Sequence, residues 1–376
     1  MTGSFNFSDA GGNVSSLTAT AYDSSGHELG TASGQISGTS GVKAGTCDFD
    51  FGADTTQVGT FSIQIFVTDA HGSQSNILTA TFQVLEPAWA IKTSLPTATG
   101  GLGVGVINGD VFAVGGARSS GGANALEEYD PVADSWTAKS SMPTARMSLA
   151  VGVVNGMLYA VGGGGGTATG TVEAYDPTSD TWTTKTSMPT PRTELAVGVI
   201  NGILYAVGGC DANDNPLGTV EAYDPTSDTW TTKTSMPTPR MGLAVGVVNG
   251  MLYAVGGTPS VSFSSTDYSV VEEYNPTTDT WITKSPMPTP RELLAVAVVN
   301  NNLYAIGGYQ YGLTGLCTVE EYNPSADSWS TKQTMPTCRG GLGAGVVNNT
   351  IYAIGGSNTY VNLTPAVEAY DPSLDP

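Results

Sequence analysis

The 376-residue sequence contains few charged residues, and very few of these are basic. Only 12% of the residues are charged, and 13 lysines and arginines stand against 33 aspartates and glutamates, giving a formal net charge of −20. Nucleic-acid binding needs a basic surface, so this balance argues against a nucleic-acid partner. No apolar run reaches transmembrane length either, so we expect no transmembrane segment.

Histidine and cysteine are also scarce, which limits the chemistry that the chain can perform. Both histidines, His27 and His71, precede the repeats described below, so those repeats have no histidine for a metal site or a Ser-His-Asp triad. The four cysteines lack metal-type spacing. Cys317 and Cys338 are two unpaired thiols or one disulfide, and the sequence leaves both possibilities open. We expect no metal and no cofactor.

A repeat of 46 to 51 residues fills most of the sequence. Each unit has a double glycine, then Tyr-Asp-Pro or Tyr-Asn-Pro, and five of the tyrosines are followed seven residues later by a tryptophan. The glycine pairs begin at Gly115, Gly162, Gly208, Gly256, Gly307 and Gly355. Such a fixed period is typical of repeat architectures whose units bury their faces against one another.

Each unit is predicted to form four short strands. In the third unit these are residues 195–200, 203–207, 220–223 and 229–232, with an Asn-Gly turn at Asn201 and Gly202. Asn-Gly between apolar runs indicates a hairpin, and prolines after a run end it. Four strands in each of six units predict a closed all-β propeller with six blades.

The two ends of the repeat region indicate how the ring closes. Tyr370 would need its tryptophan just beyond the last residue, whereas Trp89 precedes the first complete unit without a tyrosine of its own. We therefore expect residues 88–93 to supply the fourth strand of the last blade, beside residues 367–370. Such closure removes two open sheet edges.

The pattern resembles the kelch repeat family. The resemblance rests on the double glycine, the tyrosine, the tryptophan and a Met-Pro-x-x-Arg run, and it covers residues 87–376. It implies a six-bladed kelch propeller over residues 88–376. Residues 1–87 lack the repeat and alternate apolar and polar residues between turns, which predicts a small β-sandwich. Residues 61–72 are similar to the last hairpin of bacterial immunoglobulin-like and polycystic-kidney-disease-type modules, so we interpret this domain as a stalk or spacer.

Most basic residues follow the repeat. Six lysines lie three residues after the tryptophans, where they are expected to protect the outer strand edges and to pair with the glutamates two residues before each tyrosine. Five arginines open the innermost strands and are expected to surround the axial mouth. They are Arg146, Arg192, Arg240, Arg291 and Arg339, and Thr99 takes this position in the first blade. Either they bind an acidic ligand, or they satisfy backbone carbonyls in every blade.

Other candidate site residues depart from the repeat. Glu194 and Glu292 lie near the arginines and would hold a ligand, transfer a proton or form an internal ion pair. Variable loops after the glycine pairs carry aromatic residues that either stack on a ligand or pack on their own blade. They are Tyr268, Tyr309, Tyr311 and Tyr360. The oxygen-rich residues 211–215 depart from the calcium-binding EF-hand spacing.

Three functions fit these observations. The favoured one is a non-catalytic binding module whose arginine-and-loop face recognises a glycan or a protein. The second is a metal-free sugar isomerase, similar to bacterial sialic-acid mutarotases, with Glu194 or Glu292 transferring the proton. The third is a structural subunit of a surface appendage. The acidic composition rich in Thr, Ser and Gly resembles prokaryotic surface and secreted proteins, so we expect an extracellular or cell-surface location within a larger multidomain or surface assembly.

Overall fold

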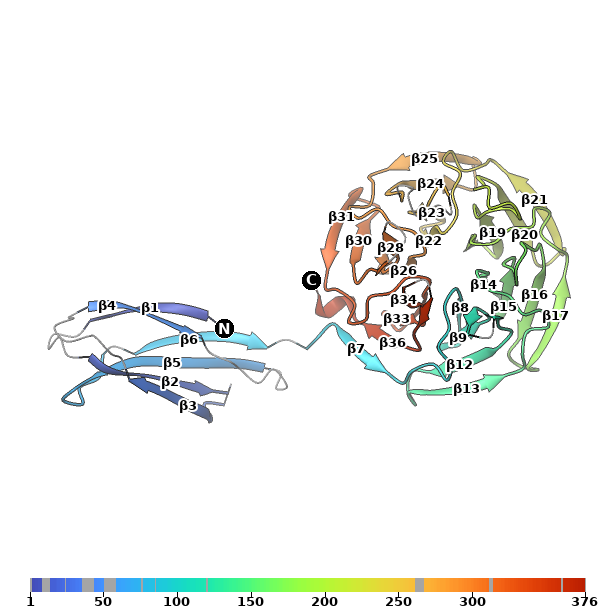
Figure 1. The fold of residues 1–376 in the computed structure, drawn as a ribbon. Coiled ribbons are helices and arrows are strands. Elements are labelled where there is room, and N and C mark those ends of the chain that lie inside the picture. Colours follow the sequence, from blue (N-terminus) through green and yellow to red (C-terminus); the bar gives the residue numbers. More distant parts are fainter. Residues whose placement is uncertain are drawn as a thin grey trace. The chain divides into compact units, whose positions relative to one another are not determined.

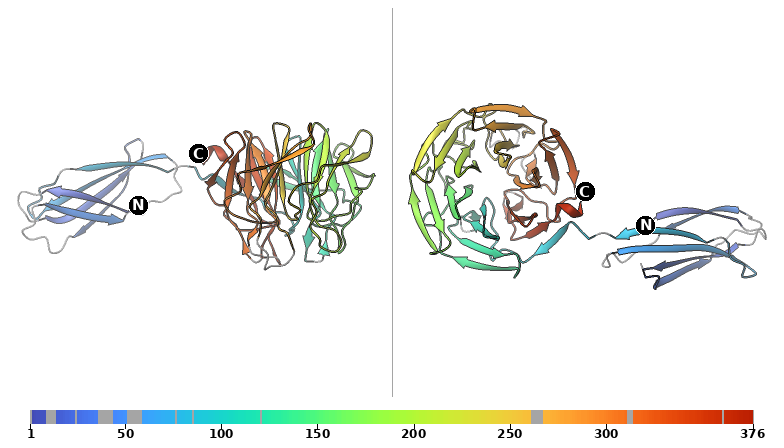
Figure 2. Two further views of the ribbon diagram at one scale, coloured as in Figure 1. Left: turned by 90° about the horizontal axis from the view of Figure 1, so that it is seen from above. Right: turned by 180° about the vertical axis from the view of Figure 1, so that it is seen from behind.

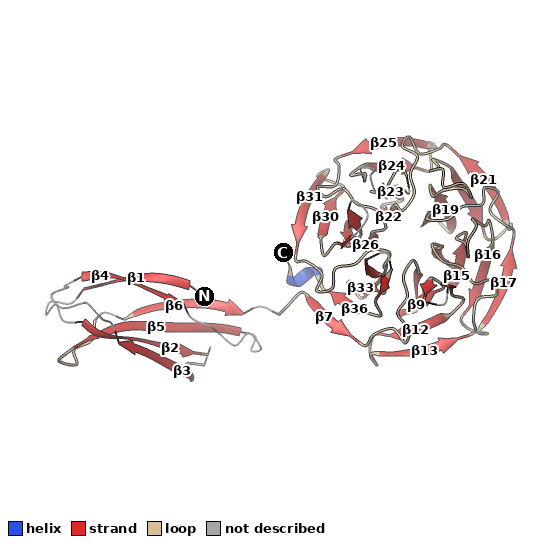
Figure 3. Cartoon of the chain, viewed as in Figure 1, coloured by secondary structure: helices blue, strands red, loops and turns tan. Residues whose placement is uncertain are grey.

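The computed structural model describes residues 2–8, 14–23, 25–35, 44–50, 59–75, 77–84, 86–119, 121–260, 267–310, 314–359 and 361–375. These residues form β-strands almost throughout, and their one helix is the 3-10 turn η1 at Pro372–Leu374 (Figure 3). No helix in this part of the chain is long and apolar enough to cross a membrane. The chain divides into two compact units, Met1–Pro87 and Ala88–Pro376. The all-β prediction is confirmed.

The N-terminal unit contains two antiparallel sheets. β1 (Thr2–Ser8) pairs with β4 (Ala44–Asp50), and the other sheet has the order β3 (Glu28–Gln35), β2 (Val14–Tyr22), β5 (Gly59–Asp69) and β6 (Leu78–Val84). Every second residue of β5 from Phe61 to Val67 is buried, the period expected of a strand with one face in a core. That the N-terminal unit belongs to the immunoglobulin-like modules stays a prediction.

The second unit contains six four-stranded antiparallel sheets, here called blades 1 to 6, set around one axis (Figure 1). The innermost strands are β8 (Gly103–Ile107), β14 (Ala150–Val154), β18 (Ala196–Ile200), β22 (Ala244–Val248), β26 (Ala295–Val299) and β32 (Gly343–Val347). The second strands are β9 (Asp110–Val114), β15 (Met157–Val161), β19 (Ile203–Val207), β23 (Met251–Val255), β27 (Asn302–Ile306) and β33 (Thr350–Ile354).

The third and fourth strands of each blade complete the ring toward its rim. The third strands are β12 (Leu126–Asp130), β16 (Val172–Asp176), β20 (Val220–Asp224), β24 (Val271–Asn275), β30 (Val319–Asn323) and β36 (Val367–Tyr370). The outermost are β13 (Ser135–Lys139), β17 (Thr181–Lys185), β21 (Thr229–Lys233), β25 (Thr280–Lys284), β31 (Ser328–Lys332) and β7 (Trp89–Lys92). Three short hairpins follow glycine pairs: β10 (Ala117–Arg118) with β11 (Gly121–Gly122), β28 (Tyr309–Gln310) with β29 (Thr314–Gly315), and β34 (Ser357–Thr359) with β35 (Asn362–Leu363).

Local sequence explains these strands. In blade 3, Asn201 and Gly202 both have positive φ, at 51° and 79°, as a two-residue hairpin turn between β18 and β19 requires. The four strands of this blade lie within one residue of the predicted ranges. Near the axis, a Cβ atom on Gly152 would lie 2.6 Å from the Leu204 side chain of the next blade. Close approach of neighbouring inner strands therefore requires a residue without a side chain there.

Tyrosine, aspartate and tryptophan join each blade to the preceding one. In blade 3, the Tyr223 hydroxyl donates to Asp228 (2.5 Å), and that carboxylate also accepts the backbone N–H of Thr186 (2.9 Å). The Trp230 indole donates to the Thr186 carbonyl at 2.9 Å. We call this arrangement the inter-blade clamp. The same bonds form around the tyrosines of the other blades.

The clamp of blade 6 is assembled from both ends of this unit. β7 pairs with β36 in the register Tyr370 opposite Trp89, so the predicted closure is confirmed. The Trp89 indole donates to the Gln333 carbonyl at 3.0 Å, while Asp375 accepts the Gln333 N–H and the Tyr370 hydroxyl. Residues nearly 290 positions apart thus hold the same segment, and only noncovalent contacts fasten β7 to its blade.

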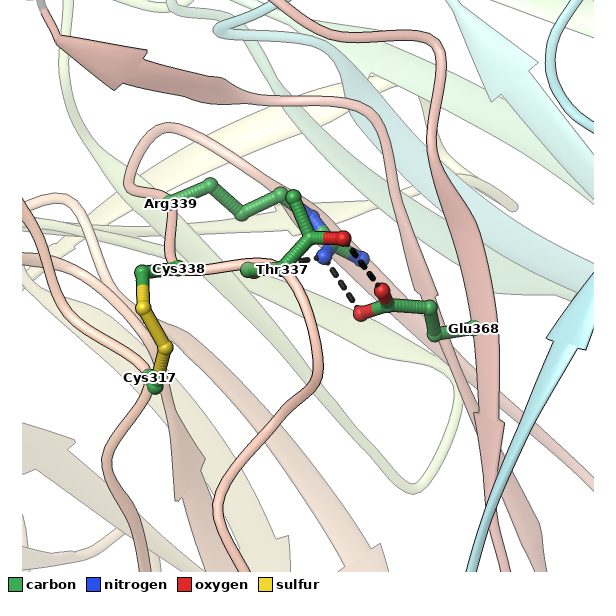
Figure 4. The surroundings of a disulfide bond; sticks show 5 residues. All are labelled: Cys317, Thr337, Cys338, Arg339 and Glu368. Atoms are coloured by element: carbon green, nitrogen blue, oxygen red, sulfur yellow. Dashed lines mark hydrogen bonds and ion pairs between the residues drawn. A yellow bond between two sulfur atoms is a disulfide. The ribbon is translucent and has the colours of Figure 1, made fainter.

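Cys317 and Cys338 form a disulfide between the segment that precedes β30 and the segment that precedes β32 (Figure 4). Cys338 lies between Thr337 and Arg339, which both contact Glu368 of blade 6. The bond thus ties blade 5 to the start of blade 6, and of the two possibilities left open by the sequence the disulfide is the one formed. Cys210 is a buried free thiol.

Trp89→Ala is expected to destabilise the protein more than Trp230→Ala. The two indoles have similar surroundings, with ring centroids 4.8 and 5.0 Å from their tyrosines. Each substitution should cost about 3 kcal/mol from the lost aromatic packing, but only Trp89→Ala should also release β7 and expose the β36 amides. Thermal unfolding and hydrogen exchange measure both effects. Equal exchange of the β36 amides in the two variants would show that closure does not depend on Trp89.

Candidate functional site at the axial mouth

Loops connect the strands at both ends of the blades (Figure 2). Six equivalent residues encircle the axis at one of these ends. Each lies two residues after the position of the repeated arginine, and we call the set the mouth ring. Its members are Gly101, Ser148, Glu194, Gly242, Leu293 and Gly341. All six have a φ between 49° and 62°, in the left-handed region. A serine, a glutamate and a leucine in this region cost backbone energy, which the surrounding structure must offset.

Backbone hydrogen bonds link the mouth ring into a closed circle. The N–H of each member donates to the carbonyl of the member in the preceding blade, at distances of 2.7 to 3.0 Å. Glu194, for example, donates to Ser148 and accepts from Gly242, both at 3.0 Å. These bonds fix the Cα of Glu194 relative to both neighbouring blades, so its side chain starts from a rigid position.

Two adjoining cavities open at the mouth ring. The first, here called the axial cavity, has a volume of about 110 Å³ and is lined by the mouth ring and by the six leucines that follow it. The other, of about 160 Å³, lies between blades 2 and 3 and includes Thr193, Asp211 and Asp214 in its lining. Ser148 and Glu194 line both. Since enclosed small-molecule sites usually measure about 300–1,000 Å³, each cavity suits a compact chemical group. A separate cavity of about 350 Å³ lies between the innermost strands and does not include the mouth ring in its lining.

Glu194 is the one ionisable side chain of the mouth ring. Burial raises its pKa to about 7, and the nearby negative charge of Asp214 adds to the effect. Its carboxylate makes no hydrogen bond or ion pair with any residue that the structure describes. A carboxyl group in this state exchanges protons near neutral pH and attracts a cation or a hydrogen-bond donor when ionised.

Glu292 is not equivalent to Glu194. It lies one residue before the mouth ring, is buried at 7% exposure, and its backbone bonds Tyr309 in both directions at 2.8 and 3.0 Å. Its Cβ lies beside Gly242 of blade 4. The structure therefore places Glu194 in the lining of both cavities, whereas Glu292 lines neither of them.

Comparison with known proteins identifies the repeat. The family model described as the KLHDC2/KLHL20/DRC7 Kelch-repeats domain matches residues 183–308, and the Kelch motif matches residues 98–143, 145–189, 290–336 and 338–375. The second unit is a kelch-repeat β-propeller. A solved structure entitled "Structure of YjhT" has the same fold, with a TM-score of 0.62, 17% identity, and coverage of 73% of this chain and 95% of that one.

A short segment also resembles a mouse protein. Over 39 residues the chain is 46% identical to Kelch-like protein 1 of Mus musculus, a match that spans 10% of this chain and 5% of that protein. A likeness of this length adds to the assignment of the repeat and carries no information about partners.

The repeated arginines of the kelch propeller do not line its mouth. All five have 0% exposure, and each forms an ion pair inside its own blade, at 2.5 to 2.8 Å, with the glutamate two residues before the tyrosine. Arg192 also donates to the carbonyls of Gly208, Thr219 and Ala206. The expectation that these guanidinium groups surround the mouth is wrong, because the blade interior needs them to satisfy its carbonyls and carboxylates. They keep no exposed surface for a ligand.

Blade 1 fills the gap in the arginine pattern from another position. Arg118, on the short strand β10, reaches Glu127 at 3.7 Å and donates to the Thr99 hydroxyl at 3.3 Å. The sequence pattern missed this substitution because Arg118 lies 19 residues after Thr99 and belongs to a variable loop. In all six blades, the glutamate two residues before the tyrosine is thus paired with an arginine.

The predicted pairing of lysines with these glutamates is also wrong. In blade 2, Lys185 stands opposite Val172 and Glu173 stands opposite Thr184, so the two side chains point to opposite faces of the sheet. The lysines instead pair with the residue one position before the tyrosine where it is glutamate. The pairs are Lys139–Glu128, Lys284–Glu273 and Lys332–Glu321, at 2.7 to 3.1 Å.

The two loop tyrosines that the structure describes are buried or half-buried. Tyr309 is 1% exposed, and its hydroxyl lies 2.5 Å from the Ser357 hydroxyl of blade 6. Tyr268 is half-buried, and its carbonyl accepts the Arg291 N–H at 3.3 Å. The buried ring of Tyr309 offers no open aromatic face of the kind that stacking on a sugar needs. Tyr311 and Tyr360 lie outside the described residues.

In the oxygen-rich loop of blade 3, the carboxylate of Asp211 accepts hydrogen bonds from within the loop itself. Both carboxylate oxygens of Asp211 accept bonds from Asn213 and Asn215. Within the described ranges, no group of three or more His, Cys, Asp or Glu side chains is arranged to hold a metal ion. The loop contributes Asp211 and Asp214 to the wall of the second cavity, a role that the sequence pattern did not indicate.

Arg240→Met is expected to destabilise the propeller by about 3–5 kcal/mol, because it leaves Glu272 buried and unpaired. Arg240→Met with Glu272→Leu should recover most of this loss. Lys284→Met, which breaks a pair near the surface, should cost at most about 1 kcal/mol. Chemical unfolding measures all three. A native stability for Arg240→Met would contradict a structural role for the arginines.

Glu194 should make stability depend on pH. Because the folded pKa of about 7 exceeds the ordinary value of 4.5, the folded state binds this proton more tightly than the unfolded state does. The resulting contribution is fully present below about pH 4.5 and is lost as the pH rises to about 7. Glu194→Gln removes it, so the difference in unfolding free energy between the two proteins should change across this window. A constant difference from pH 4 to 8 would contradict the raised pKa.

Proposed function

We propose that this chain is a non-catalytic binding module that recognises a protein partner with the mouth face of its propeller. The observation that carries the proposal is the mouth ring, in which Glu194 is held by its neighbours at the edge of two small cavities and keeps its carboxylate free of partners within the described residues. The match to kelch repeats supports a binding or scaffold role for this chain. A rigid rim with compact cavities suits the insertion of a single side chain from a partner surface.

A protein partner fits these cavities better than a glycan does. Volumes of about 110 and 160 Å³ are small for an enclosed sugar ring with its substituents. Of the two described loop tyrosines, Tyr309 is buried and Tyr268 is half-buried, which speaks against a broad stacking platform. A glycan therefore remains the second ligand class, to be distinguished by experiment.

A sugar isomerase is the enzymatic alternative, and one observation favours it. A carboxyl group with a pKa of about 7, as burial gives Glu194, suits proton transfer at neutral pH. Against it, the arginines expected to hold an acidic substrate are buried in ion pairs. Turnover of a sialic-acid anomer that is lost in Glu194→Gln would favour the enzyme over the binding module.

We also propose an extracellular or cell-surface location, with the N-terminal unit as an immunoglobulin-like spacer. The Cys317–Cys338 disulfide supports this location, because such bonds persist in oxidising compartments. The high net negative charge and the composition rich in Thr, Ser and Gly agree with it.

Ser148→Leu is expected to abolish binding of peptides selected on the wild-type propeller. Leucine already occupies this position of the mouth ring in blade 5, so the backbone accepts it, while its bulk fills part of both cavities. Peptides from a random displayed library and a glycan array would be tested in parallel. Thr183→Leu on the exposed outer strand β17 is the control and should leave binding unchanged. Selected peptides that bind Ser148→Leu at full strength, or hits on glycans alone, would contradict a protein-binding mouth.

A further inference from the structure

The mouth of the propeller is negatively charged, although the repeated arginines in the sequence suggest a positive charge. All five repeated arginines are neutralised inside the blades, and Arg118 pairs with Glu127. The charged side chains that remain around the two cavities are Glu194, Asp211 and Asp214. Among the described residues that line these cavities, an anionic ligand would meet only like charges.

Glu194 differs from the other interior carboxylates of the ring. The five glutamates that pair with the repeated arginines are buried at 1 to 2% exposure and are each bound to a guanidinium group. Glu194 occupies a position where three blades have glycine, and its side chain lines both cavities. Among the described residues it has no cation and no hydrogen-bond donor. An ionised carboxylate left half-buried in this way lacks the partner that buried charges normally have.

The backbone of the mouth ring fixes the point from which the Glu194 side chain starts. Its φ of 54° is unfavourable for glutamate, and hydrogen bonds to Ser148 and Gly242 hold both sides of the residue. Such strain is typical of functional positions, where a group must be ready in one place before its ligand arrives. Ser148, the neighbouring ring member, adds a hydroxyl to both cavities.

Size and charge together define the group that fits. The cavities admit a compact group, and a cation gains both from Glu194 directly and from the negative charge of Asp214. A metal ion would need several ligands, and the described residues contain no group of three or more candidate ligands placed to hold one. The ammonium group of a lysine is small, carries three donors, and arrives on a flexible aliphatic stem that the leucines of the axial cavity can contact.

Resting on the proposed function, we infer that the mouth of this propeller takes a lysine side chain of the protein partner, with its ammonium group bonded to the Glu194 carboxylate. The side chain enters past the mouth ring, and Ser148 offers a second acceptor for its N–H groups. Leu293 and the neighbouring leucines line the apolar part of the path. Specificity for a basic residue follows from the single carboxylate and not from the arginines.

The test uses Nα-acetyl-lysine methylamide as a cationic probe and Nα-acetyl-norleucine methylamide as its neutral counterpart. Titrations on the full ¹⁵N-labelled chain should shift the amide signals of Ser148 and Glu194 with the lysine probe, and at least fivefold less with norleucine. Glu194→Gln should weaken lysine binding by at least fivefold, since a charge-assisted hydrogen bond is lost. Glu128→Gln, which removes the same charge from the third strand of blade 1, is the matched control and should bind normally.

Equal binding of the two probes, or full lysine binding by Glu194→Gln, would overturn the inference. The peptides selected on the propeller separate this failure from that of the proposed function. If they are sensitive to Ser148→Leu but need no lysine and tolerate Glu194→Gln, the mouth binds proteins and the inference is wrong. If the selected peptides contain an essential lysine and Glu194→Gln abolishes their binding, both the proposed function and the lysine inference are supported.

Discussion

The inter-blade clamp is the interaction on which the rest of the propeller depends. In each blade one aspartate accepts a tyrosine hydroxyl from its own sheet and a backbone N–H from the preceding blade, while a tryptophan indole binds the adjacent carbonyl. The sheets are separate hydrogen-bonded units, so contacts of this kind must hold them at a fixed angle. Because the sixth clamp uses Trp89 and Asp375, neither end of the ring can leave without weakening the other.

Most of the repeated residues are needed to build the blades and to hold them together. The glycines permit the inner strands to approach, and the arginines and their glutamates satisfy the interior of each blade. Binding must then use positions that the ring does not need for itself. The mouth ring provides them, because its backbone bonds leave the identity of the side chain open. Glycine, serine, leucine and glutamate all occur there, and only the glutamate brings charge.

The strands and the closure could be predicted from sequence because they depend on short-range rules. Asn-Gly turns, proline breaks and the missing tryptophan partner of Tyr370 each act within a few residues of the strand that they define. The charged contacts could not be predicted in this way. Whether Glu173 faces Arg146 or Lys185 depends on the face of the sheet, and a shift of one residue reverses the answer.

In the candidate site, too, some features could be predicted from the sequence and others depend on the fold. Glu194 was recognisable as an exception to the repeat, but Glu292 appeared equally exceptional, and only the folded ring distinguishes them, because Glu194 lines the two cavities and Glu292 does not. The contributions of Arg118, Asp214 and Ser148 come from residues in other strands or blades that lie near them in the fold. The linear pattern does not show these neighbours.

The architecture could be inferred from the amino-acid sequence, because the repeat period, the turns and the unpaired Trp89 predict strands arranged around an axis and closed by β7. The chemistry of the mouth depends on the folded arrangement of the blades. Burial turned five arginines from a ligand surface into internal ion pairs, and the backbone circle left one carboxylate without a partner among the described residues. The physical reason is that charge acts through distance and solvent exposure, and both are properties of the folded ring.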